Sequence, residues 1–208
     1  MVGSFIVFEG ITGSGKKSHI NLLAEDLRKV GKVVTLIGFP NFETEIARLT
    51  KRTPFDSHTL SLLYAADRSQ YQERIKSLLE TENIIICDRY SYSNFAYQGA
   101  RGMDLEWLIN LEKNIIKPKI VFLIDVPVDT SMTRVSQLNI EDFTKREILE
   151  RLNKEKEIME RIREIYLYLA GNNPDKETKW FVIDGTQEMS KCYEQIKAAV
   201  RKELNIQM

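Results

Sequence analysis

The chain has 208 residues, and its thirty Lys and Arg side chains balance thirty Asp and Glu side chains, so its formal net charge is zero. This balance argues against a protein whose main task is to bind nucleic acid or an anionic membrane surface. The longest apolar run, residues 120–124, is too short to span a bilayer. The length suits one domain, residues 1–208, and the two cysteines, Cys87 and Cys192, predict buried free thiols in a reducing cytoplasm.

Short apolar runs alternate with longer amphipathic stretches along the chain. They predict strands at residues 4–9, 32–37, 83–87, 120–125 and 180–184. They predict helices at residues 16–30, 57–80, 104–116, 129–137, 143–170 and 187–204, with Asp104 as an N-cap and Gly171 as a C-terminal stop. Because the strands are apolar on both faces, we predict an α/β fold with a five-stranded parallel sheet and helices on both faces. Ligands of such sheets bind beyond the carboxyl ends of the strands.

The segment between the first strand and the first helix has the spacing of a phosphate-binding loop. Its glycines let backbone N–H groups converge on an anion, and the helix N-terminus adds a partial positive charge. We therefore expect Lys16 to reach the outer phosphates of a nucleotide. The predicted nucleotide-binding residues are Gly10, Ile11, Thr12, Gly13, Ser14, Gly15, Lys16, Lys17 and Ser18.

One position of this loop departs from the usual pattern. The residue after Lys16 is normally Ser or Thr, whose hydroxyl binds Mg²⁺, but here it is Lys17, with Ser18 one step further. An ammonium group cannot bind a metal ion. Either other groups and water hold the metal, or Lys17 itself neutralises phosphate charge.

A phosphate-binding loop does not by itself identify the phosphate acceptor, and three classes of protein that contain such a loop are possible. A switch GTPase or ATPase would need an Asp-x-x-Gly motif after a strand, and neither Asp88 nor Asp125 begins one. A nucleoside kinase would need a general base near the acceptor hydroxyl, and no carboxylate follows the second strand before Glu43. A nucleoside monophosphate kinase needs no base, but it needs arginines to hold two anions together. The chain offers Arg68, Arg89, Arg101, Arg134, Arg146 and Arg151.

Several motifs, in order along nearly the whole chain, resemble the thymidylate kinase family. They are Phe8-Glu9-Gly10 with the glycine loop, Phe39-Pro40, residues 62–68, residues 88–99, Lys117-Pro118 and Asp125-Val126-Pro127. Residues 88–97 are the most specific of these. The resemblance implies a P-loop NTPase fold with a short helical lid at about residues 135–151, and transfer of the γ-phosphate of ATP to dTMP with Mg²⁺. It also implies a homodimer; the alternative is another P-loop deoxynucleotide or deoxynucleoside kinase with a broader acceptor range.

The resemblance assigns roles at the acceptor site. Tyr64 and Arg68 are four residues apart, hence on one helix face, and they resemble the ring that stacks on thymine and the guanidinium that reads its carbonyl edge. Arg89 resembles the clamp on the acceptor phosphate. Asn94 resembles the amide that helps to read the base, and Tyr97 the ring beneath the deoxyribose.

Further roles concern the metal, the pocket wall and the donor. Asp88 resembles the carboxylate that orients Mg²⁺ and its waters. Phe39, Pro40 and Phe42 are expected to line the acceptor pocket, with core packing as the alternative for the two phenylalanines. Arg134 resembles the arginine near adenine.

The cation that completes catalysis is expected in the lid. Thr12 stands where relatives usually have an acid, and Gly13 stands where some carry a basic residue. Relatives without that basic residue tend to supply a catalytic arginine from the lid. Arg146 is the predicted catalytic lid residue, with Lys145 and Arg151 as the other candidates.

Overall fold

A parallel five-stranded sheet forms the centre of the molecule. The computed structural model describes residues 3–137, 142–154 and 156–207. The strands are β1 (Ser4–Glu9), β2 (Val34–Gly38), β3 (Ile84–Asp88), β4 (Ile120–Asp125) and β5 (Lys179–Asp184). They lie in the order β2-β3-β1-β4-β5, and all four neighbouring pairs are parallel. The predicted fold class is therefore confirmed.

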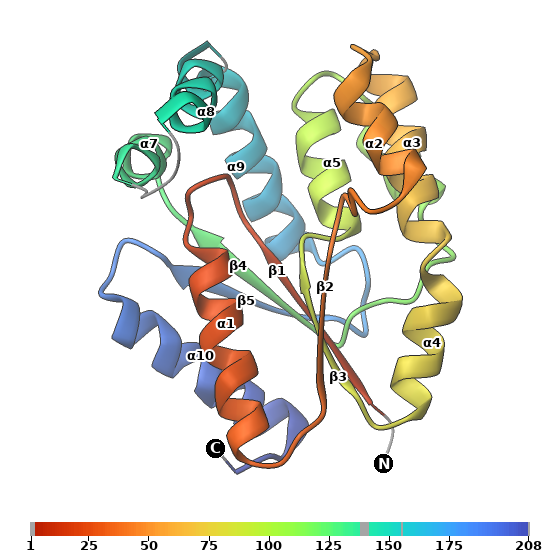
Figure 1. Ribbon diagram of the computed structural model, residues 1–208, viewed down its shortest axis with the longest axis vertical. Coiled ribbons are helices and arrows are strands. Elements are labelled where there is room, and N and C mark those ends of the chain that lie inside the picture. Colours follow the sequence, from red (N-terminus) through yellow and green to blue (C-terminus); the bar gives the residue numbers. More distant parts are fainter. Residues whose placement is uncertain (1–2, 138–141, 155, 208) are drawn as a thin grey trace.

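Helices cover both faces of the sheet (Figure 1). They are α1 (Lys16–Lys29), α2 (Glu45–Arg52), α3 (Ser57–Ser69), α4 (Gln72–Glu80), α5 (Ser91–Gly99), α6 (Leu105–Leu111), α7 (Val128–Ser136), α8 (Asp142–Lys154), α9 (Lys156–Asn172) and α10 (Met189–Leu204). Among the described residues, none of these helices has the length and apolar character that crossing a membrane requires.

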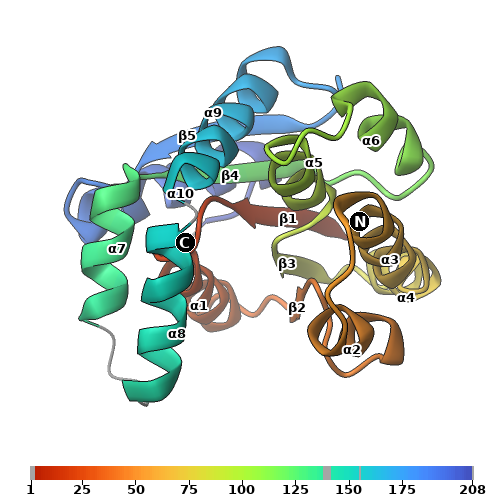
Figure 2. The same cartoon turned by 90° about the horizontal axis from the view of Figure 1, so that it is seen from above.

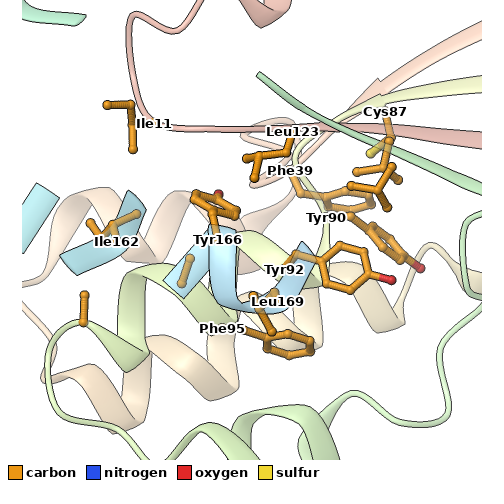
Figure 3. Packing of buried hydrophobic residues seen from close by; sticks show 14 of the residues in the cluster. Ile11, Phe39, Cys87, Tyr90, Tyr92, Phe95, Leu123, Ile162, Tyr166 and Leu169 are labelled. Atoms are coloured by element: carbon orange, nitrogen blue, oxygen red, sulfur yellow. The ribbon is translucent and has the colours of Figure 1, made fainter. Parts of the chain in front are cut away.

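The side-chain alternation of β1 divides the core into two clusters. Phe5 and Val7 pack with residues of α4, α5, α6 and α9, and Figure 3 shows part of this cluster. Ile6 and Phe8 pack on the opposite face with residues of α1 and α10. All four side chains are almost completely buried, because a central parallel strand is covered on both sides. The buried free cysteines were also predicted correctly: Cys87 lies in the first cluster and Cys192 in the second.

The long helix predicted at residues 57–80 is divided in the structure. The prediction for 57–80 covers α3 and α4, which are separated at Gln70 and Tyr71. The backbone N–H of Tyr71 bonds the carbonyl of Arg68, three residues back, so the turn tightens and α3 ends. The helix predicted at 143–170 corresponds to α8 and α9, and residue 155, between them, lies outside the described residues. Gly171 was wrongly predicted as a stop, because α9 includes it and the left-handed residue after the helix is Asn173, with φ 41°.

Two helices, α2 and α5, were not predicted. In α5 six of nine residues are buried, including polar ones, so the segment lacks an amphipathic pattern. In α2 only Ala47 is buried, and the hydroxyl of Thr44 caps the first turn. The predicted cap at Asp104 is confirmed: its carboxylate accepts the Trp107 N–H at 2.7 Å, although α6 ends at Leu111.

The loops at the carboxyl edge of the sheet lie between two groups of helices. Figure 2 shows α7 and α8 on one side of this edge and α2 and α3 on the other. Part of the predicted lid, residues 138–141, lies outside the described residues. The site described below occupies this edge.

Candidate active site

The phosphate-binding loop leaves β1 and enters α1 in a conformation that two glycines allow. Gly10 has φ 139°, and a Cβ atom there would lie 2.5 Å from the carbonyl oxygen of Ile124. Gly13 has φ 76°, and a Cβ atom there would lie 2.7 Å from the carbonyl oxygen of Ser131. The loop backbone is therefore in close contact with β4 and α7, and larger residues at these positions would push it away.

Lys16 is buried at the first turn of α1. Its ammonium group donates hydrogen bonds to the carbonyl oxygens of Gly10 and Ile11, each at 2.9 Å, and to the Ser14 hydroxyl at 3.3 Å. Burial, and next the charge of Arg89, lower the pKa of Lys16 from 10.5 to about 7. An anion placed in the loop would compete with the two carbonyl oxygens for this ammonium group.

Arg134 connects the phosphate loop to the end of β5. Its guanidinium donates to the Ser14 carbonyl at 3.3 Å and to the Gly185 carbonyl at 2.6 Å. The arginine thus lies beside the loop, on the side where a nucleotide donor was predicted. Lys17 and Ser18, by contrast, are exposed on the first turn of α1.

A cavity of about 480 Å³ lies next to the loop and is large enough for a small organic ligand. All eight residues predicted to contact the acceptor line it: Phe39, Pro40, Phe42, Tyr64, Arg68, Arg89, Asn94 and Tyr97. Five other residues complete the wall: Thr12, Leu60, Ser93, Gln98 and Arg101. Ser93 and Gln98 fall within the specific motif at 88–99, which was the signal that could have identified them. The peptide bond between Phe39 and Pro40 is cis.

Hydroxyl groups surround the guanidinium of Arg89 at the loop end of this cavity. One nitrogen donates to the Ser93 hydroxyl at 3.1 Å and to the Tyr166 hydroxyl at 3.2 Å. The other donates to the Tyr97 hydroxyl at 3.2 Å, and the guanidinium lies 5.1 Å from the centre of the Tyr97 ring. The backbone N–H of Arg89 bonds the Phe8 carbonyl, with φ at 67°. Such conformations cluster at functional sites, because they persist only where surrounding contacts enforce them.

Glu9, which the sequence analysis named in a motif but gave no role, lies in a buried hydrogen-bond cluster beside Arg89. It is fully buried at the end of β1 and accepts hydrogen bonds from the Tyr90 N–H at 2.8 Å and the Ser93 hydroxyl at 2.6 Å. The Tyr166 hydroxyl donates to it at 2.9 Å. Burial raises the pKa of Glu9, while the charge of Arg89 and these hydrogen bonds oppose the increase. A carboxylate within a buried apolar strand was the available signal.

Arg68, which lines the cavity, forms a buried ion pair with Glu112, which does not. Arg68 and Glu112 form two parallel hydrogen bonds, each 2.5 Å long. Burial lowers the pKa of Arg68, but the attraction of Glu112 outweighs it and the pKa is raised. Asn94 donates to Glu112 at 2.9 Å and to the Ser61 carbonyl at 3.1 Å. Tyr64 is half-buried one helical turn before Arg68. Glu112 was not predicted, because it is 44 residues from Arg68.

Asp88 stands where the metal ligand was predicted, at the carboxyl end of β3. One of its carboxylate oxygens is buried and accepts no hydrogen bond from the described residues. A buried acceptor without a partner is costly unless something else satisfies it. The carboxylate therefore fits a role in holding a hydrated cation. No group of three or more His, Cys, Asp or Glu side chains in the described part of the chain could hold a metal by itself.

The predicted lid cation does not reach this site. The side chain of Arg146 is 80% exposed on α8, pairs with Glu150 at 2.9 Å and is not among the cavity-lining residues. Lys145 is half-buried on the same helix, and the side chain of Arg151 lies outside the described part of the chain. The structure thus brings the predicted loop and acceptor residues together, but not Arg146.

A different cation, which was not predicted, lies beside the loop. Arg163 of α9 donates to both carboxylate oxygens of Asp125, at 2.6 and 2.8 Å. Both residues line a narrow crevice together with Gly10 and Ile11. The ion pair thus attaches α9 to the end of β4 next to the phosphate loop.

Comparisons with known proteins agree with this geometry. A family model described as thymidylate kinase matches residues 8–196. The protein named probable thymidylate kinase of Thermococcus kodakarensis is 37% identical, over 94% of this chain and 96% of that protein. The thymidylate kinase of Plasmodium falciparum is 33% identical, over 96% of this chain and 90% of that protein. Since the family model covers most of the chain and both relatives align with nearly all of it, the chain belongs to the thymidylate kinase family.

Proposed function

We propose that this protein transfers the γ-phosphate of ATP to dTMP and releases ADP and dTDP. One observation carries the proposal beyond family membership: a single cavity beside the phosphate loop is lined both by Arg89 and by Arg68 and Asn94. A guanidinium suits a phosphate at one end and a carbonyl at the other. The relatives named above favour this acceptor over the broader range that was the alternative.

The proposed chemistry needs positioning and charge more than acid–base catalysis. The acceptor phosphate is already anionic, so no group has to remove a proton from it. Arg89 would hold this phosphate in line with the γ-phosphate of ATP in the loop. Lys16 would exchange the carbonyl oxygens of Gly10 and Ile11 for phosphate oxygens, and its charge would stabilise the transferring group.

The proposed reaction includes Mg²⁺, which neutralises phosphate charge when it is bound with ATP. Asp88 is the residue that would hold it, through water, together with the nucleotide phosphates. This assignment is supported by the unpartnered buried oxygen of Asp88 and by the absence of a hydroxyl at Lys17. Lys17 would then contribute positive charge near the phosphates rather than a metal ligand.

The remaining parts of the proposal concern the donor site, the lid and the assembly. Arg134 would contact the adenine side of ATP, and Arg146 is proposed as a lid cation. We propose one P-loop kinase domain over residues 1–208, a cytoplasmic location and a homodimer. Size-exclusion chromatography with light scattering tests the homodimer directly.

A nucleotide-specificity assay tests the proposed function. With ATP and Mg²⁺, the protein should phosphorylate dTMP but not thymidine, which has no phosphate for Arg89 to hold. dCMP should be at least about 10²-fold poorer in kcat/KM, roughly 2.7 kcal/mol, because its 4-amino group would face the donors of Arg68. Phosphorylation of thymidine without turnover of dTMP would replace this proposal with a nucleoside kinase.

A further inference from the structure

Glu112 contacts two of the residues at the base end of the cavity without lining the cavity itself. It is the C-cap residue of α6, directly after Leu111, and its side chain is 1% exposed. One carboxylate oxygen accepts from Nε of Arg68, and the other accepts from Nη2 of Arg68 and Nδ2 of Asn94. The carboxylate therefore holds an arginine and an amide in one fixed arrangement.

These hydrogen bonds determine which polar atoms of Arg68 and Asn94 remain available to bind a ligand. With Nε and Nη2 bound to Glu112, Nη1 is the nitrogen of Arg68 that has no hydrogen bond to a described residue. The amide nitrogen of Asn94 donates to Glu112 and to the Ser61 carbonyl, so both its hydrogens are used. Its oxygen Oδ1 is buried and has no partner in the described part of the chain. The pair thus presents one donor, Nη1, and one acceptor, Oδ1.

This pattern is complementary to the hydrogen-bonding groups of one class of pyrimidine. Thymine and uracil carry a carbonyl at position 4, which accepts, and an N–H at position 3, which donates. Cytosine has the opposite arrangement at both positions. A donor and an acceptor fixed side by side therefore favour the first class and leave two polar groups mismatched with the second.

We propose that Glu112 is a positioning residue that sets base specificity from outside the cavity. It keeps Nη1 of Arg68 directed as a donor, and together with the Ser61 carbonyl it prevents the Asn94 amide from turning over to present its NH₂ group. A neutral amide at residue 112 could itself donate to the Asn94 oxygen, which removes one of these two restraints on the amide. The inference rests on the proposed function, since it assumes a pyrimidine nucleotide in this cavity.

The test compares kcat and KM for dTMP and dCMP in the wild type and in Glu112→Gln. We expect the ratio of kcat/KM values, dTMP over dCMP, to fall at least tenfold in the variant. Most of the fall should come from a higher KM for dTMP, while kcat/KM for dCMP stays constant or rises. Calorimetric titration with each monophosphate should show the same change in relative affinity. A Glu112→Gln protein that folds normally and loses efficiency equally with both nucleotides would overturn the inference.

Two further variants separate positioning from general stability. Asp125 and Arg163 form another ion pair with two hydrogen bonds, and neither residue lines the main cavity. Asp125→Asn removes the carboxylate of that pair. Whatever the effect of this variant on rate, its ratio of kcat/KM for dTMP to kcat/KM for dCMP should equal that of the wild type. Glu112→Asp keeps the buried charge but retracts the carboxylate by one methylene group, so it tests the inference if Glu112→Gln does not fold. Its ratio should fall severalfold, and an unchanged ratio would also overturn the inference.

Turnover and affinity measurements on the wild type distinguish a failure of this inference from a failure of the proposed function. Absence of dTMP turnover by the wild type would reject the proposed function alone. The relative affinities of the wild type and the Glu112 variants for dTMP and dCMP would still test whether Glu112 sets base preference.

Discussion

The ammonium group of Lys16 lies 2.9 Å from the carbonyl oxygen of Gly10, so the loop's own backbone holds the cation that is proposed to bind phosphate. Two carbonyl dipoles partly replace water around this buried charge, but burial still lowers the pKa of Lys16 to about 7. The protonation of one side chain therefore connects the loop's stability to nucleotide binding.

Proton uptake on ATP binding is the first prediction. Above about pH 7 a large fraction of Lys16 is neutral, and bound phosphate should raise its pKa again, so the protein should take up a proton at about pH 8. Calorimetric titrations in two buffers with different ionisation enthalpies measure this uptake. Lys16→Met is the control and should show none. Identical binding enthalpies for the wild type in both buffers would contradict the prediction.

The same pKa shift predicts how stability depends on pH. Between about pH 7 and 10.5 the unfolded chain binds more protons at this position than the folded chain does. The contribution of Lys16 to the free energy of unfolding should therefore rise with pH across this window and stay constant below it. Denaturant unfolding of the wild type and Lys16→Met, in the absence of nucleotide, measures the difference. A difference that does not change between about pH 7 and 10 would show that Lys16 keeps an ordinary pKa.

A third prediction concerns Gly13. Gly13→Ala adds a Cβ atom 2.7 Å from the Ser131 carbonyl, at a residue with positive φ, so it should cost about 2 kcal/mol or more and weaken ATP binding. Gly31→Ala is the matched control, because Gly31 has φ 78° but no atom within 4 Å of the added carbon. It should cost only about 1 kcal/mol and leave ATP binding unchanged. Equal destabilisation of the two variants would show that the close contact with α7 does not matter.

Lys17→Thr should keep activity within about tenfold, or ~1.4 kcal/mol. Lys17 is exposed, and the proposed metal site uses Asp88, water and phosphates, so the lysine is not needed as a ligand. Steady-state kinetics over a range of Mg²⁺ concentrations measure the effect. A folded but inactive variant would indicate that Lys17 supplies essential positive charge.

Tyr97 is proposed to lie beneath the deoxyribose and it also contacts Arg89, so two substitutions separate the effects of ring and hydroxyl. Tyr97→Phe keeps the ring and loses the 3.2 Å hydrogen bond to Arg89, so we expect about tenfold lower kcat/KM with the preference for dUMP over UMP retained. Tyr97→Ala removes the ring and should weaken that preference as well. The ratio of kcat/KM values for dUMP and UMP is the measurement, and equal use of both by the wild type would refute the role of the ring.

Sequence patterns correctly predicted the structural features that depend on only a few neighbouring residues. Apolar strands, the glycine spacing of residues 10–16 and the cap at Asp104 each act within a few residues, and the structure has the loop, the sheet and the cap where they were expected. The residues proposed to bind the acceptor were named through family motifs, since their positions in the cavity depend on how β2, α3 and α5 meet.

Pairings between distant residues could not be predicted in this way. Glu9 and Tyr166 are 157 residues apart, and Arg68 and Glu112 are 44 apart, so no periodicity links them. The helix α5 was missed for a related reason: neighbours surround it, and burial on most sides removes the polar face that marks a helix in a sequence.

The hydroxyl groups around Arg89 have a consequence for how fast a dianionic substrate can bind. Among the described residues, Arg163 and Arg146 each hold a carboxylate, whereas the hydrogen-bond partners of Arg89 are the neutral hydroxyls of Ser93, Tyr97 and Tyr166. An arriving phosphate therefore has no competing anion to displace from this guanidinium. Glu9 and Asp88 attract the guanidinium through space but accept no hydrogen bond from it, so no direct ion pair has to break before a phosphate binds.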